Sequence, residues 1–416
     1  MTFPVNGNLY QHFTYFLKGD ISKLYMTIAI RNLAMGMVGI FTPVYIFLYY
    51  HNSFALTALY FGLMFGLYGM FAVFGGRLLG RFGAEKCMFA SSFFFIAHFL
   101  SLFFIETSSL LVPASLLTAA LGLTLFWPAF HTEFARFSSQ ERRGSEAGRV
   151  NVAMIMPTIL APALGGVLLM FFGFPVLFIA ASLLLLASVI PLFYAADHHE
   201  VYTDSFKVAW GRIFRKENRA VSTSLLSEGL EIGVSGYVWP VFLFLVAPQF
   251  SEMGFITSIA LVGSSLFMLY AGRVSDTQRR TGLLNIGAIW TSLAWVLRYF
   301  IATPFSALLT NTNYEIARAA SSVPYRTLFY ERAALLREEA DEFIIYFEVV
   351  SNMGRFFFFS GLAAIFWLFP LLPLQTTFFL GALFSLGLML LGNPPKLRLP
   401  HAQKYENPAK RRQRDF

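Results

Sequence analysis

The chain has 416 residues, of which 56% are hydrophobic and only 13% are charged. Charged residues make up about a quarter of an ordinary soluble domain, so this composition excludes a soluble globular protein. The net charge of +8 suits an anionic membrane surface, and we expect membrane lipid, not nucleic acid, to be the partner of the basic C-terminal tail.

Long apolar runs without the alternating pattern of a membrane β-barrel predict an all-α membrane protein with twelve transmembrane helices. Six spans are expected in the first half of the chain, at residues 24–49, 55–76, 87–106, 109–133, 149–171 and 174–196. Six more are expected in the second half, at residues 220–246, 252–272, 282–302, 304–325, 343–368 and 371–392. The predicted organisation is an N-terminal segment, a six-helix bundle, an amphipathic linker, a second six-helix bundle and a basic tail, at residues 1–23, 24–196, 197–219, 220–392 and 393–416.

Lys and Arg are distributed unevenly between the predicted connections. Of the 31 such residues, only Arg31, Arg298, Arg318 and Arg355 lie in the interior of predicted spans, and Arg149 is the first residue of one. All the others fall in the tails or in alternate connections, and the remaining connections contain none. Because Lys and Arg are retained on the cytoplasmic side of short loops, we expect a multi-pass protein of the plasma (inner) membrane with both termini in the cytoplasm.

The two halves contain an internal repeat. The basic, glycine-containing stretch "GRLLGRFGAEK" begins at Gly76, and its counterpart "GRVSDTQRR" begins 196 positions later at Gly272. In the first span of each half the offset is 197, from Pro43 to Pro240. Two parallel halves of this kind predict a transporter that rocks around a site near the membrane midplane.

The first stretch resembles the signature loop between the second and third helices of the major facilitator superfamily, which reads Gly-x-Leu-x-Asp-Arg-x-Gly-Arg-Lys. The glycines and the arginine match, whereas Gly80 stands at the acidic position. The resemblance implies loops that help to close the cytoplasmic side, with Asp276 as the acidic residue; the alternative is a solvated basic loop. The candidate gating residues are Gly76, Arg77, Arg81, Gly83, Gly272, Arg273, Asp276 and Arg280.

The fifth span, "GRVNVAMIMPTILAPALGG", is similar to the antiporter signature of the same superfamily. Gly148, Pro162, Gly165 and Gly166 match in register, and small residues there permit close helix packing. An ordinary membrane helix rich in Gly and Pro is the alternative. The resemblance favours export, but the fourth span lacks the Arg that proton-driven drug exporters of the superfamily usually carry, so export is only slightly favoured over uptake.

Ionisable residues inside spans are costly and usually face a cavity or one another. Glu231 and Glu315 lie about 16 Å into their spans and are the candidates for proton coupling. The alternative for Glu315 is a permanent pair with Arg318, three residues away on one helix face. The candidates for the substrate cavity are Arg31, Glu228, Asn311, Asn313, Arg318, Asn352 and Arg355.

Two further interpretations concern these polar residues. Glu348, Asn352 and Arg355 form a stripe that is also typical of packing between the halves. Arg31 and Glu228 are 197 positions apart, the same offset as the two prolines, which suggests an ion pair across the cytoplasmic mouth. The alternative is that Arg31 extends to the inner membrane surface.

The sequence contains no phosphate-binding loop, no assembled nucleophile and base, and no metal-ligand pattern, so we expect no enzyme activity, cofactor or metal. The function that these features favour is a monomeric secondary active transporter that moves a small organic solute by alternating access, coupled to protons. Uptake by proton symport is the alternative. A receptor or scaffold that does not transport is an alternative of another class.

Overall fold

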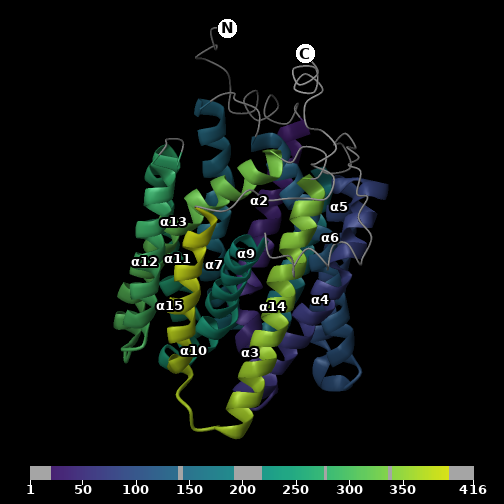
Figure 1. Ribbon diagram of the computed structural model, residues 1–416. Coiled ribbons are helices and arrows are strands. Elements are labelled where there is room, and N and C mark those ends of the chain that lie inside the picture. Colours follow the sequence, from purple (N-terminus) through teal and green to yellow (C-terminus); the bar gives the residue numbers. More distant parts are fainter. Residues whose placement is uncertain (1–19, 139–143, 192–217, 276–278, 336–339, 393–416) are drawn as a thin grey trace, which may run out of the picture.

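The computed structural model describes residues 20–138, 144–191, 218–275, 279–335 and 340–392. These residues form long helices that lie side by side along one direction, and none of the described residues belongs to a β-strand (Figure 1). The predicted all-α membrane fold is confirmed. The predicted N-terminal segment, linker and tail lie almost entirely outside the described residues.

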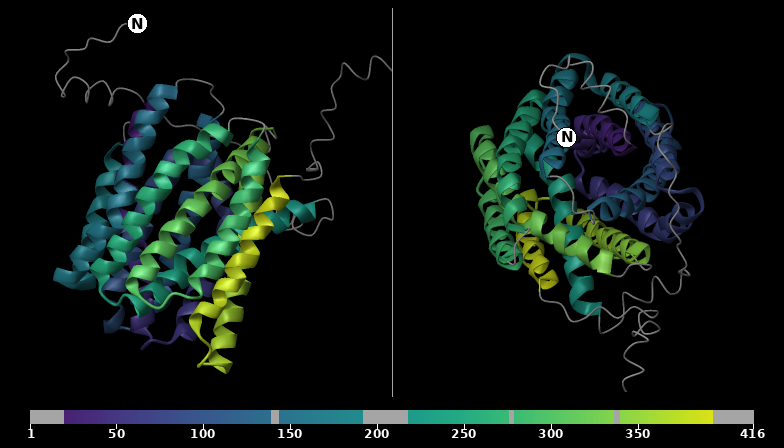
Figure 2. Two further views of the ribbon diagram at one scale, coloured as in Figure 1. Left: turned by 90° about the vertical axis from the view of Figure 1, so that its left-hand side faces the viewer. Right: turned by 90° about the horizontal axis from the view of Figure 1, so that it is seen from above.

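The helices of each half follow one another with short connections. The first half comprises α2 (Asp20–Gly39), α3 (Phe41–Tyr49), α4 (Phe54–Phe82), α5 (Ala84–Phe103), α6 (Leu111–Ser138) and α7 (Gly144–Val189). The second half comprises α9 (Arg219–Gly233), α10 (Trp239–Val246), α11 (Phe250–Ser275), α12 (Arg280–Arg298), α13 (Pro304–Leu335), α14 (Ala340–Leu368) and α15 (Phe378–Gly387). Seen along the helices, the first half, in purple and blue, faces the second half, in green and yellow (Figure 2).

Nine stretches of the described residues are long and apolar enough to cross a membrane. One of them, Ile155–Val189, is interrupted at Gly173, whose φ of 75° breaks α7, so this stretch covers two predicted spans. Helices α12 and α13 are not among the nine because polar side chains lower their hydropathy. With these two helices and the divided α7, the described residues account for the twelve predicted spans.

The first span of each half is broken just before its proline. In the first half α2 ends at Gly39, and α3 begins two residues before Pro43. In the second half α9 gives way to a π-helical turn, Val234–Val238, immediately before α10 and Pro240. Proline lacks an N–H and clashes with the preceding turn, so a break at this place is expected in both spans.

The same pairs of helices pack together in both halves. In the first half α2 packs on α7, and α6 packs on both α4 and α5. In the second half the corresponding helices behave likewise, since α9 packs on α14, and α13 packs on both α11 and α12. This shared pattern of packing is what a duplicated six-helix unit predicts.

Two pairs of long helices join the halves, α4 with α14 and α7 with α11. Between α7 and α11 the backbones come close at Gly254, where an added Cβ would lie 2.4 Å from the carbonyl oxygen of Pro162. The amide of the next residue, Ala163, donates to Ser258 Oγ on α11 at 3.0 Å. Small residues permit this approach, as is common between membrane helices.

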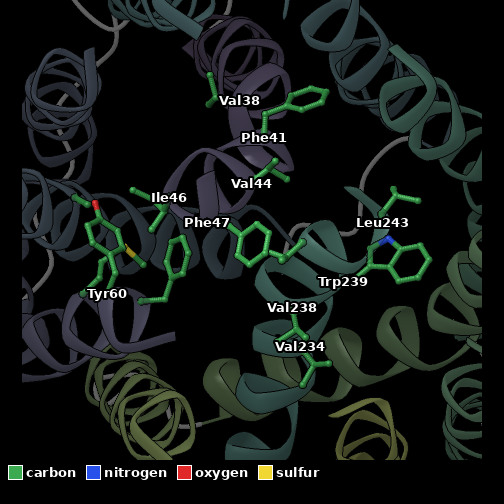
Figure 3. Packing of buried hydrophobic residues seen from close by; sticks show 14 of the residues in the cluster. Val38, Phe41, Val44, Ile46, Phe47, Tyr60, Val234, Val238, Trp239 and Leu243 are labelled. Carbon is green, nitrogen blue, oxygen red and sulfur yellow. The ribbon is translucent and has the colours of Figure 1, made fainter. Parts of the chain in front are cut away.

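Broken helices also meet at the interface between the halves, where α3 packs against α10. Figure 3 shows Phe47 of α3 lying close to the helix that carries Val238 and Trp239. The side chains in this contact are apolar and buried. It lies at the end of the bundle away from the connection between α4 and α5, as Figure 1 shows.

Several helices extend further than predicted at the end where α4 connects to α5. Helix α4 continues to Phe82, so Gly76 lies within a helix and the turn consists of Gly83, with a φ of 87°. The predicted end of this span at Gly76 is therefore six residues too early, because the apolar run stops before the helix does. We call this end of the molecule, which carries Arg77, Arg81 and Arg273, the basic end.

Candidate functional site

A buried carboxylate lies at the last turn of α9, next to the π-helical break. Glu231 is 2% exposed and receives donors from two other helices. Its Oε1 accepts hydrogen bonds from the Tyr314 hydroxyl on α13 and from Trp295 Nε1 on α12, the latter at 3.3 Å. Its Oε2 pairs with Arg318 Nε on α13 at 3.2 Å. The carboxylate thus links α9 to α12 and α13.

A second arginine stands beside this carboxylate and has no carboxylate partner among the described ion pairs. Arg298 of α12 is fully buried, and its guanidinium carbon lies 3.8 Å from the ring centre of Trp239 and 3.6 Å from that of Tyr314. It donates to Asn311 Oδ1 on α13. Its Nε and Nη1 and the Asn311 amide nitrogen have no hydrogen-bond partner among the residues that the structure describes. Aromatic faces stabilise a desolvated cation here.

We call these residues the Glu231 cluster. Its members are Glu231, Trp295, Arg298, Asn311, Tyr314 and Arg318. Since two arginines and the carboxylate of Glu231 come together, and Glu231 and Arg298 are buried, a change in the charge of Glu231 alters the balance of the whole cluster.

The other candidates of the second half lie around this cluster. Glu315 is half-buried on α13, and both Arg298 and Arg318 are near enough to interact with it electrostatically. The ion pair that the spacing predicted, Glu315 with Arg318, is replaced by the pair of Arg318 with Glu231. Asn313 accepts a hydrogen bond from Trp290 Nε1 at 3.1 Å and thereby joins α12 to α13.

Arg31 lies inside the first half. It is 3% exposed, donates to Ser92 Oγ at 3.3 Å, and its guanidinium carbon is 3.7 Å from the ring centre of Phe126. Glu228 is half-buried on α9 and interacts electrostatically with arginines of its own half, Arg326 foremost. The described contacts therefore give Arg31 and Glu228 separate surroundings in this conformation.

The stripe on α14 connects that helix to α9. Arg355 Nε donates to the carbonyl oxygen of Gly229 at 2.7 Å, and its Nη1 donates to Asn352 Oδ1 at 2.8 Å. Asn352 Nδ2 in turn donates to Glu348 Oε2 at 3.0 Å. These contacts place Asn352 and Arg355 in a polar network that meets α9 at Gly229, two residues before Glu231.

The candidate gating residues lie at the basic end. Arg81 is exposed in the last turn of α4, and Gly272 and Arg273 belong to the last turns of α11. Arg280 forms an ion pair with Glu331, which joins the start of α12 to α13. Asp276 lies outside the described residues.

The candidates for the antiporter signature lie on α7, with Gly148 in its first turns. A Cβ at Gly165 would lie 2.2 Å from the carbonyl oxygen of Met37 on α2, and one at Gly166 would lie 2.4 Å from that of Phe250 on α11. Adjacent glycines thus bring α7 close to one helix of each half.

The sequence did not identify every member of the Glu231 cluster as a site residue. Arg298 was recognisable only as one of four arginines inside predicted spans, and Trp295 was one aromatic residue among many. Among the described residues no group of three or more His, Cys, Asp and Glu could hold a metal ion. The chemistry available at the site is reversible proton binding and recognition of polar or aromatic groups.

Comparisons with known proteins agree with the fold described above. The sequence profile of the Major Facilitator Superfamily matches residues 24–247. A multi-drug resistance efflux pump PmrA homolog of Lactococcus lactis subsp. lactis (strain IL1403) is 22% identical over 310 residues, which cover 71% of this chain and 76% of the relative.

Two solved structures share the fold at low sequence identity. A POT family transporter in complex with 5-aminolevulinic acid has a TM-score of 0.65 at 10% identity, with 89% of this chain and 94% of that chain covered. A variant of the nucleoside transporter NupG has a TM-score of 0.65 at 12% identity, with 90% and 99% covered. The proteins that this chain resembles in sequence and fold are transporters, not enzymes.

Proposed function

The chain belongs to the major facilitator superfamily of membrane transporters, and from this premise we propose that it exports a small organic solute in exchange for protons. The exchange takes place by alternating access between the two halves, each of six helices. The domain division is the one that the sequence predicts, with the bundles at residues 24–196 and 220–392.

The observation that carries this proposal is the environment of Glu231. A carboxylate that is 2% exposed in a membrane helix is costly unless it is paired or protonated. It stands beside a helix break, where a change of backbone geometry needs least disruption. It is therefore suited to bind a proton in one conformation and an arginine in another.

A proton on Glu231 changes the forces between three helices. The neutral carboxyl group no longer attracts Arg318, so the contact between α9 and α13 weakens and Arg318 becomes available to a polar group of the solute. Conversely, a solute that binds Arg318 competes with the carboxylate and favours its protonation. This mutual exclusion is the requirement for exchange.

Two observations support the direction of transport and the orientation. The relative whose name describes multi-drug efflux favours export, as does the match of Pro162, Gly165 and Gly166 to the antiporter signature. Arg77, Arg81 and Arg273 at the basic end favour an orientation with this end and both termini in the cytoplasm. The protein acts as a monomer in the plasma membrane.

The test uses inside-out vesicles that contain the purified protein, with ethidium as the probe. Acidification of the vesicle interior is expected to drive accumulation of ethidium, and Glu231→Gln is expected to abolish this accumulation. Glu106→Gln, which alters an exposed carboxylate at the opposite end, is the matched control and is expected to behave like the wild type. Accumulation driven by an acidic exterior instead would favour uptake by symport, and accumulation unaffected by the gradient would contradict proton coupling.

A further inference from the structure

Four buried polar side chains join the two halves on the side of the midplane toward the basic end. Tyr68 of α4 donates its hydroxyl to Glu348 Oε2 of α14 at 2.6 Å, across 280 residues of chain. His131 of α6 approaches the same carboxylate, with its Nε2 3.6 Å from Glu348 Oε1. Its Nδ1 lies 2.8 Å from the hydroxyl of Tyr330 on α13. We call these four residues the inter-half contact.

Every member of the inter-half contact is at most 6% exposed. Within the described part of the chain, Glu348 Oε1, the oxygen that faces His131, has no hydrogen-bond partner. The imidazole is surrounded by rings, among them Trp127 of its own helix and Phe347 of α14. A carboxylate and an imidazole therefore face each other between the halves, with aromatic rings around the imidazole.

Other charged groups face this pair from the neighbouring helices. Arg355 of α14 and Glu228 of α9 interact electrostatically with Glu348, and Arg326 of α13 interacts with His131. Arg326 and Arg355 together balance Glu228 and Glu348 while the imidazole is neutral, so the group carries no excess negative charge. An added proton instead supplies the hydrogen bond that Glu348 Oε1 lacks among the described residues, since this oxygen lies 3.6 Å from His131 Nε2.

The contacts between the halves at the opposite end are of another kind. Rings of Phe54 and Phe366 lie 4.8 Å apart, those of Phe41 and Phe250 lie 6.2 Å apart, and α3 packs on α10 through apolar side chains. Phenylalanine rings do not titrate. Of the two sets of contacts, only the one toward the basic end contains an imidazole and a carboxylate.

We propose that His131 and Glu348 form a proton-binding site between the halves, separate from the Glu231 cluster, which holds the basic end closed while the proton is bound. This inference rests on the proposed function in so far as the halves move apart during transport. The pair holds one proton, on either His131 Nε2 or Glu348 Oε1. The Tyr330 hydroxyl can donate to His131 Nδ1 or accept from it, so it fits either form of the imidazole.

Opening of the basic end reverses this binding. When α6 and α4 move away from α14, water reaches the carboxylate and solvates its charged form, so the proton leaves on the side that has opened. Because the closed state binds the proton and the open state releases it, a low pH favours the closed basic end and a high pH favours the open one. Proton binding at this pair is thus coupled to the arrangement of the two halves.

The experiment measures the distance between spin labels at Phe82 of α4 and Tyr270 of α11, two exposed positions toward the basic end. The single cysteine, Cys87, is buried and is replaced by serine so that only the labels react. Distances are measured on the full-length protein in nanodiscs without substrate or gradient, at about pH 5 and about pH 9, on either side of the range in which histidines titrate. The wild type is expected to give longer distances at the higher pH.

The variants separate this site from the Glu231 cluster. His131→Gln and Glu348→Gln are each expected to abolish the change with pH, and either suffices if the other does not fold. Tyr68→Phe removes a hydrogen bond between the halves but no proton-binding group, so longer distances at both pH values, with the change retained, are expected. Glu231→Gln is expected to retain the change, because its contacts lie within the second half.

Two results would overturn the proposal: equal distances in the wild type at both pH values, or a change with pH that survives in His131→Gln or Glu348→Gln. Loss of the change in Glu231→Gln alone would assign the effect to the other cluster and would also contradict it. Since the measurement needs neither solute nor gradient, a protein that fails to accumulate ethidium can still confirm or contradict this site.

Discussion

Arg318 forms its ion pair with Glu231 on another helix, at 3.2 Å, and not with Glu315, which precedes it by three residues on α13. The pair therefore depends on how α9 packs in its half. Helix α9 ends at Gly233, so the carboxylate of Glu231 lies at a helix break, while Arg318 lies in the middle of a continuous helix. An ion pair between two helices breaks and re-forms when the helices move relative to each other. An ion pair within one helix turn is not affected by such movement.

The first prediction concerns the strength of this pair. Arg318→Gln leaves the Glu231 carboxylate buried without its cation and is expected to destabilise the protein by about 3 to 5 kcal/mol. Glu231→Gln combined with Arg318→Gln is expected to cost less than the sum of the two single changes, since neither charge is then left alone. The midpoint of thermal unfolding in detergent measures both; strictly additive losses would show that the two groups are not coupled.

The second prediction distinguishes the two carboxylates that the sequence made equal candidates for proton coupling. Glu315 is half-buried and accepts no hydrogen bond in the described structure, whereas Glu231 accepts three. Glu315→Gln is therefore expected to retain gradient-driven accumulation of ethidium within about a factor of ten, a difference of about 1.4 kcal/mol. Complete loss of accumulation in Glu315→Gln with full activity in Glu231→Gln would reverse the assignment.

The features that could be predicted from the sequence are those with local causes. The number of spans follows from the length of apolar runs, and the breaks before Pro43 and Pro240 follow from the missing proline N–H. For this reason the all-α fold and the duplication into halves could be predicted from the sequence. Helices α12 and α13 differ, because the polar residues that lower their hydropathy include Arg298, Asn311 and Arg318 of the Glu231 cluster.

The partners of polar residues could not be predicted in the same way. The spacing of three residues predicts Glu315 as the ion-pair partner of Arg318. Only the packing of α9 on its neighbours shows that the partner is Glu231. Similarly, Tyr330 lies 199 residues beyond His131, and no local pattern relates them. The partners of buried polar groups depend on how helices pack against one another. A single sequence does not contain this information.

The third prediction concerns the close approach of α7 and α11. Gly254→Val would place a Cβ 2.4 Å from the carbonyl oxygen of Pro162, so the two backbones must move apart. A marked loss of transport and a lower unfolding temperature are expected. Gly361→Val on α14, where an added Cβ meets nothing within 4 Å, is the control and is expected to leave both unchanged. Equal behaviour of the two variants would mean that this contact does not hold the halves together.

The last prediction revises the hypothesis that Arg31 and Glu228 pair across the cytoplasmic mouth. In the structure the Arg31 guanidinium lies over the Phe126 ring, 3.7 Å from its centre, and its hydrogen bond goes to Ser92 at 3.3 Å. Both partners belong to the first half. Arg31→Glu and Glu228→Arg are thus each expected to impair transport, and the double exchange is expected to recover none of it.

The flat guanidinium is what suits Arg31 to this position between aromatic rings. Arg31→Lys keeps the charge but loses planar stacking on Phe126, and Phe126→Leu removes the ring while keeping an apolar side chain. Each is expected to cost up to about 2 kcal/mol in the free energy of unfolding, as for a desolvated cation over an aromatic face. Ser92→Ala is expected to cost less, because a long hydrogen bond to a hydroxyl contributes about 1 kcal/mol or below. Recovery of transport in the double exchange, together with a wild-type unfolding temperature in Phe126→Leu, would instead support the ion pair across the mouth.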